Sequence, residues 1–189
     1  GYYTLGSFEF AKKEQINRQL NTNLLGTMEM TKEIIPHFRI QKSGVIINIS
    51  SITGVTTVPL QTIYHATKWG VEGFSESLQH ELRQFNIRIK IIEPGVVHTD
   101  FYGRSMTTIS NPEVYEYDSY TERVRRNIIQ NSEKGSAPEE VANTIYRAAT
   151  DNKTKLRYPT GKSKELALLY KLLPHKIFAP LIRGAMEKG

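Results

Sequence analysis

The sequence lacks cysteine altogether, and this absence is the first constraint on its chemistry. Disulfide bridges and thiolate catalysis are excluded, and a reducing compartment is allowed, so we expect a cytoplasmic protein. No apolar run approaches the ~18 residues that a membrane-spanning helix needs. Neither an internal repeat nor a low-complexity linker interrupts the 189 residues, whose composition is that of one globular domain.

Positive charge is in slight excess, because the sequence has 25 basic and 19 acidic residues and therefore a net charge of +6. This balance permits an anionic ligand such as a dinucleotide. The basic residues are scattered through predicted helices instead of forming one run with aromatics, which argues against nucleic-acid binding. The five histidines show no metal-ligand pattern, so we expect no metal site.

The stretch from Ser51 to Lys68 contains a serine hydroxyl, a phenol and an ammonium group in an order suited to proton transfer. Tyr64 and Lys68 are four positions apart, so on a helix they share one face. A phenol ionises near pH ~10, but a nearby ammonium group stabilises the phenolate and lowers that pKa. The pattern therefore predicts Tyr64 as a general acid or base and Lys68 as the group that tunes it.

The same spacing recurs at Tyr158 and Lys162, so the pair alone does not identify a site. A proline and a glycine lie between those two residues and exclude an ordinary helix turn there. The residues after Tyr64 can continue a helix, and an apolar strand predicted at 45–50 runs directly into Ser51. We therefore assign the predicted site to the Tyr64 copy.

Helices and strands alternate along the rest of the predicted secondary structure. The first ten residues are predicted as a loop because they contain two glycines and several hydroxyls. Capping-box patterns at Ser119 and at Ser136 predict two helix starts. Strands are predicted at 45–50, 87–94 and 156–160, and helices at 10–41, 64–85, from about 118, and 136–149.

Three motifs together resemble the short-chain dehydrogenase/reductase family: the Ser51, Tyr64 and Lys68 spacing, Asn23-Leu24-Leu25-Gly26, and the turn from Pro94 to Thr99. The resemblance covers nearly the whole chain but only the later part of the family's fold. It implies an α/β, doubly wound parallel sheet of Rossmann type, of which residues 1–189 form the C-terminal catalytic part.

The family's opening Thr-Gly-x-x-x-Gly-x-Gly loop, which cradles the pyrophosphate, does not occur in this sequence. Gly1 resembles the last residue of the family's later Asn-Ala-Gly element. The residues that choose NAD over NADP are therefore expected in a part of the family's fold that this sequence does not contain. We expect residues 1–189 alone to be inactive.

The resemblance implies hydride transfer between NAD or NADP and an alcohol/carbonyl substrate. Tyr64 would exchange the hydroxyl proton, Ser51 would hold the carbonyl oxygen, and Lys68 would bind the ribose. Asn23 would complete a proton relay, although a helix-face amide explains the same residue. Ser50 would lie close to the cofactor as a structural hydroxyl.

The turn at Pro94-Gly95 would receive the nicotinamide at the carboxyl end of its strand. Val97 would offer backbone groups to the carboxamide, and Thr99 would offer a hydroxyl. A plain strand-ending turn explains the proline and glycine equally well.

Two further segments are assigned by the resemblance or by their pattern. Residues 101–135 would form the substrate lid, with four tyrosines that could line it: Tyr102, Tyr115, Tyr117 and Tyr120. Residues 163–189 are amphipathic and are broken by two prolines. We expect this segment to pack on its own domain or on a partner subunit, in preference to lying on a membrane surface.

In the family, the helices predicted at 10–42 and 64–85 form a four-helix interface with a second subunit. The resemblance therefore implies a homodimer or homotetramer. A non-catalytic dinucleotide-binding or dimerisation module of the same fold is the alternative function. In either case the strand at 45–50 is expected at a bare sheet edge when residues 1–189 stand alone.

Overall fold

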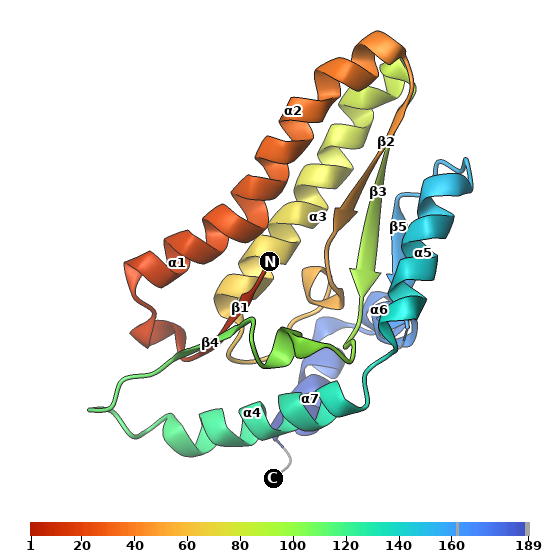
Figure 1. Cartoon of the computed structure of the whole chain (residues 1–189). Helices are drawn as coiled ribbons and strands as arrows, with labels where there is room; N and C mark the ends of the chain where they lie inside the picture. The colour runs from red at the N-terminus through yellow and green to blue at the C-terminus, as the bar shows by residue number, and fades with distance from the viewer. Residues whose placement is uncertain (162, 188–189) are drawn as a thin grey trace.

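The structure is a computed structural model, and it describes residues 1–161 and 163–187. Its larger sheet is parallel and has the strand order β2-β3-β5 (Figure 1). These strands are β2 (Gly44–Ile49), β3 (Ile87–Pro94) and β5 (Arg157–Thr160). All three predicted strands are confirmed, and β2 lies at the edge of the described sheet, as expected.

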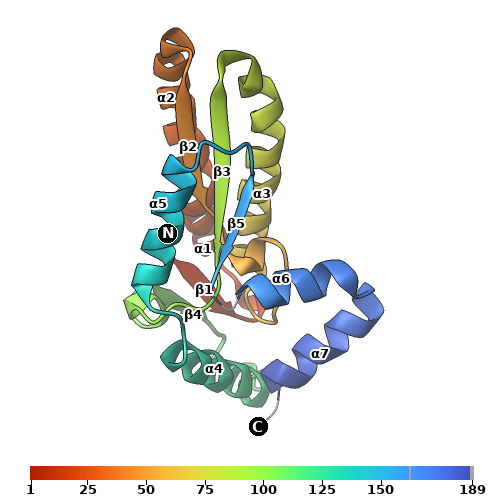
Figure 2. The ribbon, with the colours of Figure 1, turned by 90° about the vertical axis from the view of Figure 1, so that its right-hand side faces the viewer.

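Helices cover both faces of this sheet (Figures 1 and 2). Successive strand residues point to opposite faces, so Ile46 of β2 packs in one apolar cluster with Leu78, whereas Ile47 packs in another with Ala148. The first cluster lies under α2 (Gly26–Gln41) and α3 (Thr62–Leu82), and the second lies under α5 (Pro138–Thr150). The doubly wound α/β arrangement is therefore confirmed.

The long helix predicted at 10–41 is α1 (Lys13–Leu20) and α2, joined by a π-helical turn at Asn21–Leu25. A π turn adds one residue to the helical repeat and commonly marks functional positions. Asn23, the first residue of the Asn23-Leu24-Leu25-Gly26 motif, lies within this turn. α2 ends at Gln41, and the next residue, Lys42, adopts a left-handed conformation with φ of 52°.

The predicted loop at the start of the chain is wrong. Residues Tyr3–Gly6 form strand β1, which pairs in parallel with β4 (Met106–Ile109), a strand inside the predicted lid. All four residues of β1 are buried. Because the partner strand lies about a hundred residues away, the local glycines and hydroxyls gave no sign of the pairing.

Both predicted capping boxes are wrong as well. The residues that precede α4 (Asp118–Glu133) and α5 are Tyr117 and Ala137, and neither makes a side-chain cap. Ser136 instead forms a β-bridge with Val97. The backbone of Ser136 therefore belongs to the turn after β3, and Pro138 starts the helix two residues later.

The amphipathic tail forms α6 (Ser163–Leu172) and α7 (His175–Glu187). The chain breaks near Pro174 as predicted, but Pro180 lies inside α7. α7 packs against α4, where the Asn127 side chain donates a hydrogen bond to the Met186 carbonyl at 2.8 Å.

Lys162 of the second Tyr/Lys pair and residues 188–189 lie outside the described residues. Within 1–161 and 163–187, no helix is long and apolar enough to cross a membrane.

Candidate active site

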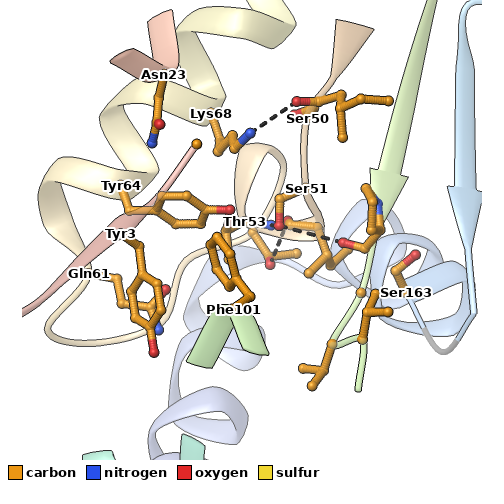
Figure 3. A pocket seen from close by; sticks show the side chains of 18 of the residues that line it. Tyr3, Asn23, Ser50, Ser51, Thr53, Gln61, Tyr64, Lys68, Phe101 and Ser163 are labelled. Atoms are coloured by element: carbon orange, nitrogen blue, oxygen red, sulfur yellow. Dashed lines mark hydrogen bonds between the residues drawn. The ribbon is translucent and has the colours of Figure 1, made fainter. Parts of the chain in front are cut away.

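The carboxyl ends of β2 and β3 meet at one edge of the sheet, which is where open parallel sheets bind their ligands. Here the Ser51 hydroxyl donates to the Pro94 carbonyl at 3.5 Å, and the Ser50 amide donates to the Ile92 carbonyl at 2.8 Å. A cavity of about 1040 Å³ opens at this edge (Figure 3). All nine predicted site residues line it: Asn23, Ser50, Ser51, Tyr64, Lys68, Pro94, Gly95, Val97 and Thr99.

Tyr64 and Lys68 both lie on α3 and face the cavity, as their spacing predicts. The Lys68 ammonium group lies 5.7 Å from the centre of the Tyr64 ring and donates to the Ile49 carbonyl at 3.0 Å. Burial lowers the pKa of Lys68 to about 8, an effect that the nearby Glu72 carboxylate opposes. The lysine is therefore held between the tyrosine ring and the end of β2.

The Tyr64 side chain is almost fully buried, and burial is the main reason why its pKa lies well above 10. The neighbouring Tyr102 raises this pKa further, whereas the hydroxyls of Ser51 and Thr53 favour the phenolate and lower it. Burial outweighs the hydroxyls, so the phenol is protonated at neutral pH. This is the protonation state that a proton donor needs. The tuning of Tyr64 by Lys68 stays a prediction.

Ser51 lies two residues after β2 and caps a short 3-10 turn, because its hydroxyl accepts a hydrogen bond from the Thr53 amide at 3.2 Å. The loop that follows is held by His65, whose Nδ1 lies 2.8 Å from the Thr53 carbonyl. Nε2 of the same ring lies 3.0 Å from the Val58 amide. Burial lowers the pKa of His65. The histidine thus fixes the loop beside Ser51 from the first turns of α3.

Asn23 is buried in the π turn, and its side chain is occupied by backbone groups. The amide nitrogen donates to the Tyr2 carbonyl at 2.7 Å, and the amide oxygen accepts from the Tyr2 amide at 3.2 Å. The same nitrogen lies 3.5 Å from the Thr67 hydroxyl, one residue before Lys68 on α3. Asn23 therefore fixes the start of β1 beside α3, and its role in a proton relay remains a prediction.

The turn after β3 is packed tightly against α6. A side chain at Gly95 would approach the Ser163 amide to 3.1 Å, and the Ser163 hydroxyl donates to the Glu93 carbonyl at 2.8 Å. Thr99 caps the next short turn, where its hydroxyl accepts from the Phe101 amide at 3.4 Å. These contacts hold the backbone of the turn against the cavity.

An ion-pair network under the site was not found from the sequence. Nε of Arg157 on β5 lies 3.0 Å from Glu72 and 3.4 Å from Glu93, and both carboxylates are buried. Glu72 follows Lys68 by one helical turn, and Glu93 immediately precedes Pro94. Arg157 thus ties the helix of Lys68 to the turn after β3. Lys68 and Glu72 show a recognisable i, i+4 spacing, but their arginine lies more than eighty residues further along the chain.

An aromatic cluster around Tyr64 was also missed. The ring centre of Tyr64 lies 5.8 Å from that of Tyr3 and 6.1 Å from that of Phe101, and the last two rings stack at 5.1 Å. Of the four tyrosines predicted for the lid, Tyr102 lines the cavity, whereas Tyr115 is 73% exposed. Tyr3 was missed because β1 was taken for a loop.

Comparisons with known proteins agree with this arrangement. A family model described as short chain dehydrogenase matches residues 1–109. An uncharacterised oxidoreductase of Schizosaccharomyces pombe is 38% identical over 161 residues, which cover 85% of this chain and 67% of the relative. A 3-ketodihydrosphingosine reductase of Bacteroides thetaiotaomicron is 33% identical over 158 residues, which cover 82% of this chain and 58% of that protein.

Among solved structures, a short-chain dehydrogenase from Streptomyces avermitilis superposes with a TM-score of 0.78 at 27% identity. The superposition covers 97% of this chain and 66% of that protein. The chain thus spans about two thirds or less of the length of these relatives. Fold, edge cavity and matched sequence agree: the chain belongs to the short-chain dehydrogenase family.

Proposed function

We propose that the protein carrying this chain is an NAD(P)-dependent oxidoreductase that interconverts an alcohol and a carbonyl compound. The observation that carries the proposal is the convergence of Ser51, Tyr64 and Lys68 on one cavity at the carboxyl edge of the sheet. One relative is named as the reductase of a ketone, which is a substrate of this class.

The residues present fit the nicotinamide half of the cofactor. Val97 would offer backbone groups and Thr99 a hydroxyl to the nicotinamide, and Lys68, which lines the same cavity, would bind the ribose. Gly95 keeps the turn free of a side chain where it approaches Ser163. When bound, the nicotinamide supplies or accepts the hydride at the substrate carbon.

In the direction of reduction, the Ser51 hydroxyl would hold the carbonyl oxygen by a hydrogen bond. Tyr64 would donate its phenolic proton to that oxygen while the carbon receives the hydride, so that the ketone gains one hydride and one proton and becomes the alcohol. The positive charge of Lys68 would stabilise the phenolate that remains. Oxidation of the alcohol runs through the same groups in reverse.

The alternative is a non-catalytic dinucleotide-binding or dimerisation module of the same fold, which does not turn over substrate. The two functions are separated by following nicotinamide absorbance with a panel of ketones and alcohols. The assay uses protein expressed from the whole open reading frame that encodes this chain. Steady turnover supports the enzyme, whereas cofactor binding without turnover on the whole panel supports the module.

Assembly as a homodimer or homotetramer belongs to the same proposal. α2 and α3 are the long helices that the family resemblance assigns to the subunit interface, and both carry exposed apolar side chains. Met30 is 74% exposed and Ile40 is 78% exposed on α2, and Trp69 is 43% exposed on α3. A second copy that covers such residues would remove apolar surface from water.

A further inference from the structure

One side of the cavity beside the Tyr64 ring is lined by aromatic and aliphatic side chains, whereas the hydroxyls of Ser51 and Thr53 lie at its phenol oxygen. Tyr3 and Phe101 stand next to Tyr64 (Figure 3). Ile182 and Met186 of α7 pack against the same buried cluster, which also contains Ile128 of α4. These residues come from the start of the chain, the lid and the tail, and together they form an apolar wall. The apolar wall is defined by Tyr3, Phe101, Tyr102, Ile128, Ile182 and Met186, all of which line the cavity.

Charged side chains are scarce around this cavity. Among the described residues that line it, the only charged side chains are Lys68 and Lys134, and Asp, Glu, Arg and His do not occur. Lys68 belongs to the proton-transfer group, and Lys134 is already engaged with another group of the protein. A carboxylate or phosphate that lay against the apolar wall would lose its water without gaining a dedicated partner there, which is costly.

The two phenol groups of the apolar wall offer little to a polar substrate. The Tyr3 hydroxyl donates to the sulfur of Met106 at 3.1 Å, so its polar end is bonded within β4. Burial is the main cause that raises the pKa of Tyr102 to about 12, which is the behaviour of a phenol in surroundings of low polarity. A polyol such as a sugar would find few partners for its hydroxyls along these rings and methyl groups.

We propose that the site takes an uncharged, predominantly apolar ketone or secondary alcohol, whose reacting carbon lies at Tyr64 and whose hydrocarbon part lies along the apolar wall. Phe101 and Met186 are assigned as specificity-determining residues, because one comes from the lid and the other from α7. This inference rests on the proposed redox function but makes a separate statement about the substrate.

The test is a series of straight-chain methyl ketones of increasing length, assayed with the protein from the whole open reading frame. Each ketone is matched to one of the same length that ends in a carboxylate. Burial of one methylene group predicts a rise in kcat/KM of about fourfold per added carbon until the wall is spanned. The terminal carboxylate is expected to lower kcat/KM at least tenfold. A flat dependence on chain length, or a carboxylated ketone that reacts as fast as its partner, would overturn the inference.

Variants show whether the apolar wall sets the preference. Met186→Gln keeps the side-chain volume and adds a buried amide, so the rise in kcat/KM per added carbon should fall to twofold or less. Phe101→Ser should lower this rise as well. The control is Tyr115→Ser, a change in the same lid at a side chain that is 73% exposed. It should leave the dependence of kcat/KM on chain length unchanged. An unchanged slope in a folded Met186→Gln protein would remove Met186 from the assignment.

Failure of the inference and failure of the proposed function are distinguished by calorimetry. Isothermal titration with the same ketones measures the dissociation constant without turnover. If no ketone turns over but affinity still rises about fourfold per carbon, the apolar site stands and the redox proposal falls. If turnover occurs but neither kcat/KM nor the affinity changes with chain length, the redox proposal stands and the apolar site falls.

Discussion

Replacing Lys68 with methionine should stabilise the folded protein at neutral pH. Burial lowers the pKa of this lysine from 10.5 to about 8, and at ~1.4 kcal/mol per unit the buried charge costs the folded state about 3 kcal/mol. Methionine has a similar length and no charge, so Lys68→Met removes this cost. It also removes the hydrogen bond to the Ile49 carbonyl, worth about 1 kcal/mol. The expected net gain in the free energy of unfolding at pH 7 is about 2 kcal/mol.

The gain should depend on pH in a defined direction. The unfolded chain keeps the proton of Lys68 up to about pH 10.5, whereas the folded protein releases it from about pH 8. Between these values the folded state binds fewer protons, so wild-type stability rises with pH and the advantage of Lys68→Met shrinks. Urea unfolding at pH 7 and at pH 10 measures the difference.

The exposed Lys13 provides the matched control, because Lys13→Met should change the free energy of unfolding by less than ~0.5 kcal/mol. A Lys68→Met protein that is less stable than wild type at pH 7 would refute the reasoning. A difference in the free energy of unfolding that is the same at pH 7 and pH 10 would refute it as well. In the protein from the whole open reading frame, the same variant should weaken cofactor binding and move the pH–rate profile to higher pH, because the phenolate loses its positive neighbour.

Tyr64→Phe should lower turnover by about 10²–10⁴-fold, while the exposed Tyr146→Phe should not; a loss below tenfold would count against Tyr64 as the proton donor. Arg157→Leu should cost about 3 kcal/mol of stability in urea unfolding, because two buried carboxylates lose their guanidinium group. The control Arg104→Leu removes an exposed pair and should cost less than ~1 kcal/mol; equal losses would contradict the network. Residues 1–189 alone should show no one-to-one micromolar binding of NAD or NADP by calorimetry, and such binding would disprove the expectation. Light scattering of the protein from the whole reading frame should give a dimer or tetramer, and a monomer at micromolar concentration would exclude the proposed assembly.

The sequence was informative wherever the signal is local. The apolar run at 45–50 and the isoleucine-rich run at 87–94 indicated two strands of the larger sheet, the third was predicted at 156–160, and the spacing of Tyr64 and Lys68 placed both on α3. The motif residues then fell on one cavity because consecutive parallel strands end at the same edge. Side-chain identity and periodicity were sufficient for these elements.

The sequence was uninformative where a residue acts through a distant partner. Residues Tyr3–Gly6 are a strand only because Met106–Ile109 lies beside them, and the glycines and hydroxyls of the first ten residues indicated a loop. The Arg157 network was not predicted for the same reason: its two carboxylates lie on α3 and β3, far from Arg157 in the sequence. The capping box at Ser136 failed because Ser136 is held in a bridge with Val97, so tertiary pairing overrode the local pattern. The box at Ser119 failed because α4 already begins at Asp118.

The pairing of β1 with β4 also has a consequence for biosynthesis. Tyr3 and its strand partner Met106 are separated by 103 positions. A ribosome that adds about 5–20 residues per second would leave Tyr3 without that partner for roughly 5–20 s. During this interval Tyr3 and Leu5, which are almost fully buried in the folded protein, stay accessible on the nascent chain. A chaperone that recognises short apolar segments would find one at Tyr3–Gly6 until residues 106–109 have left the ribosome.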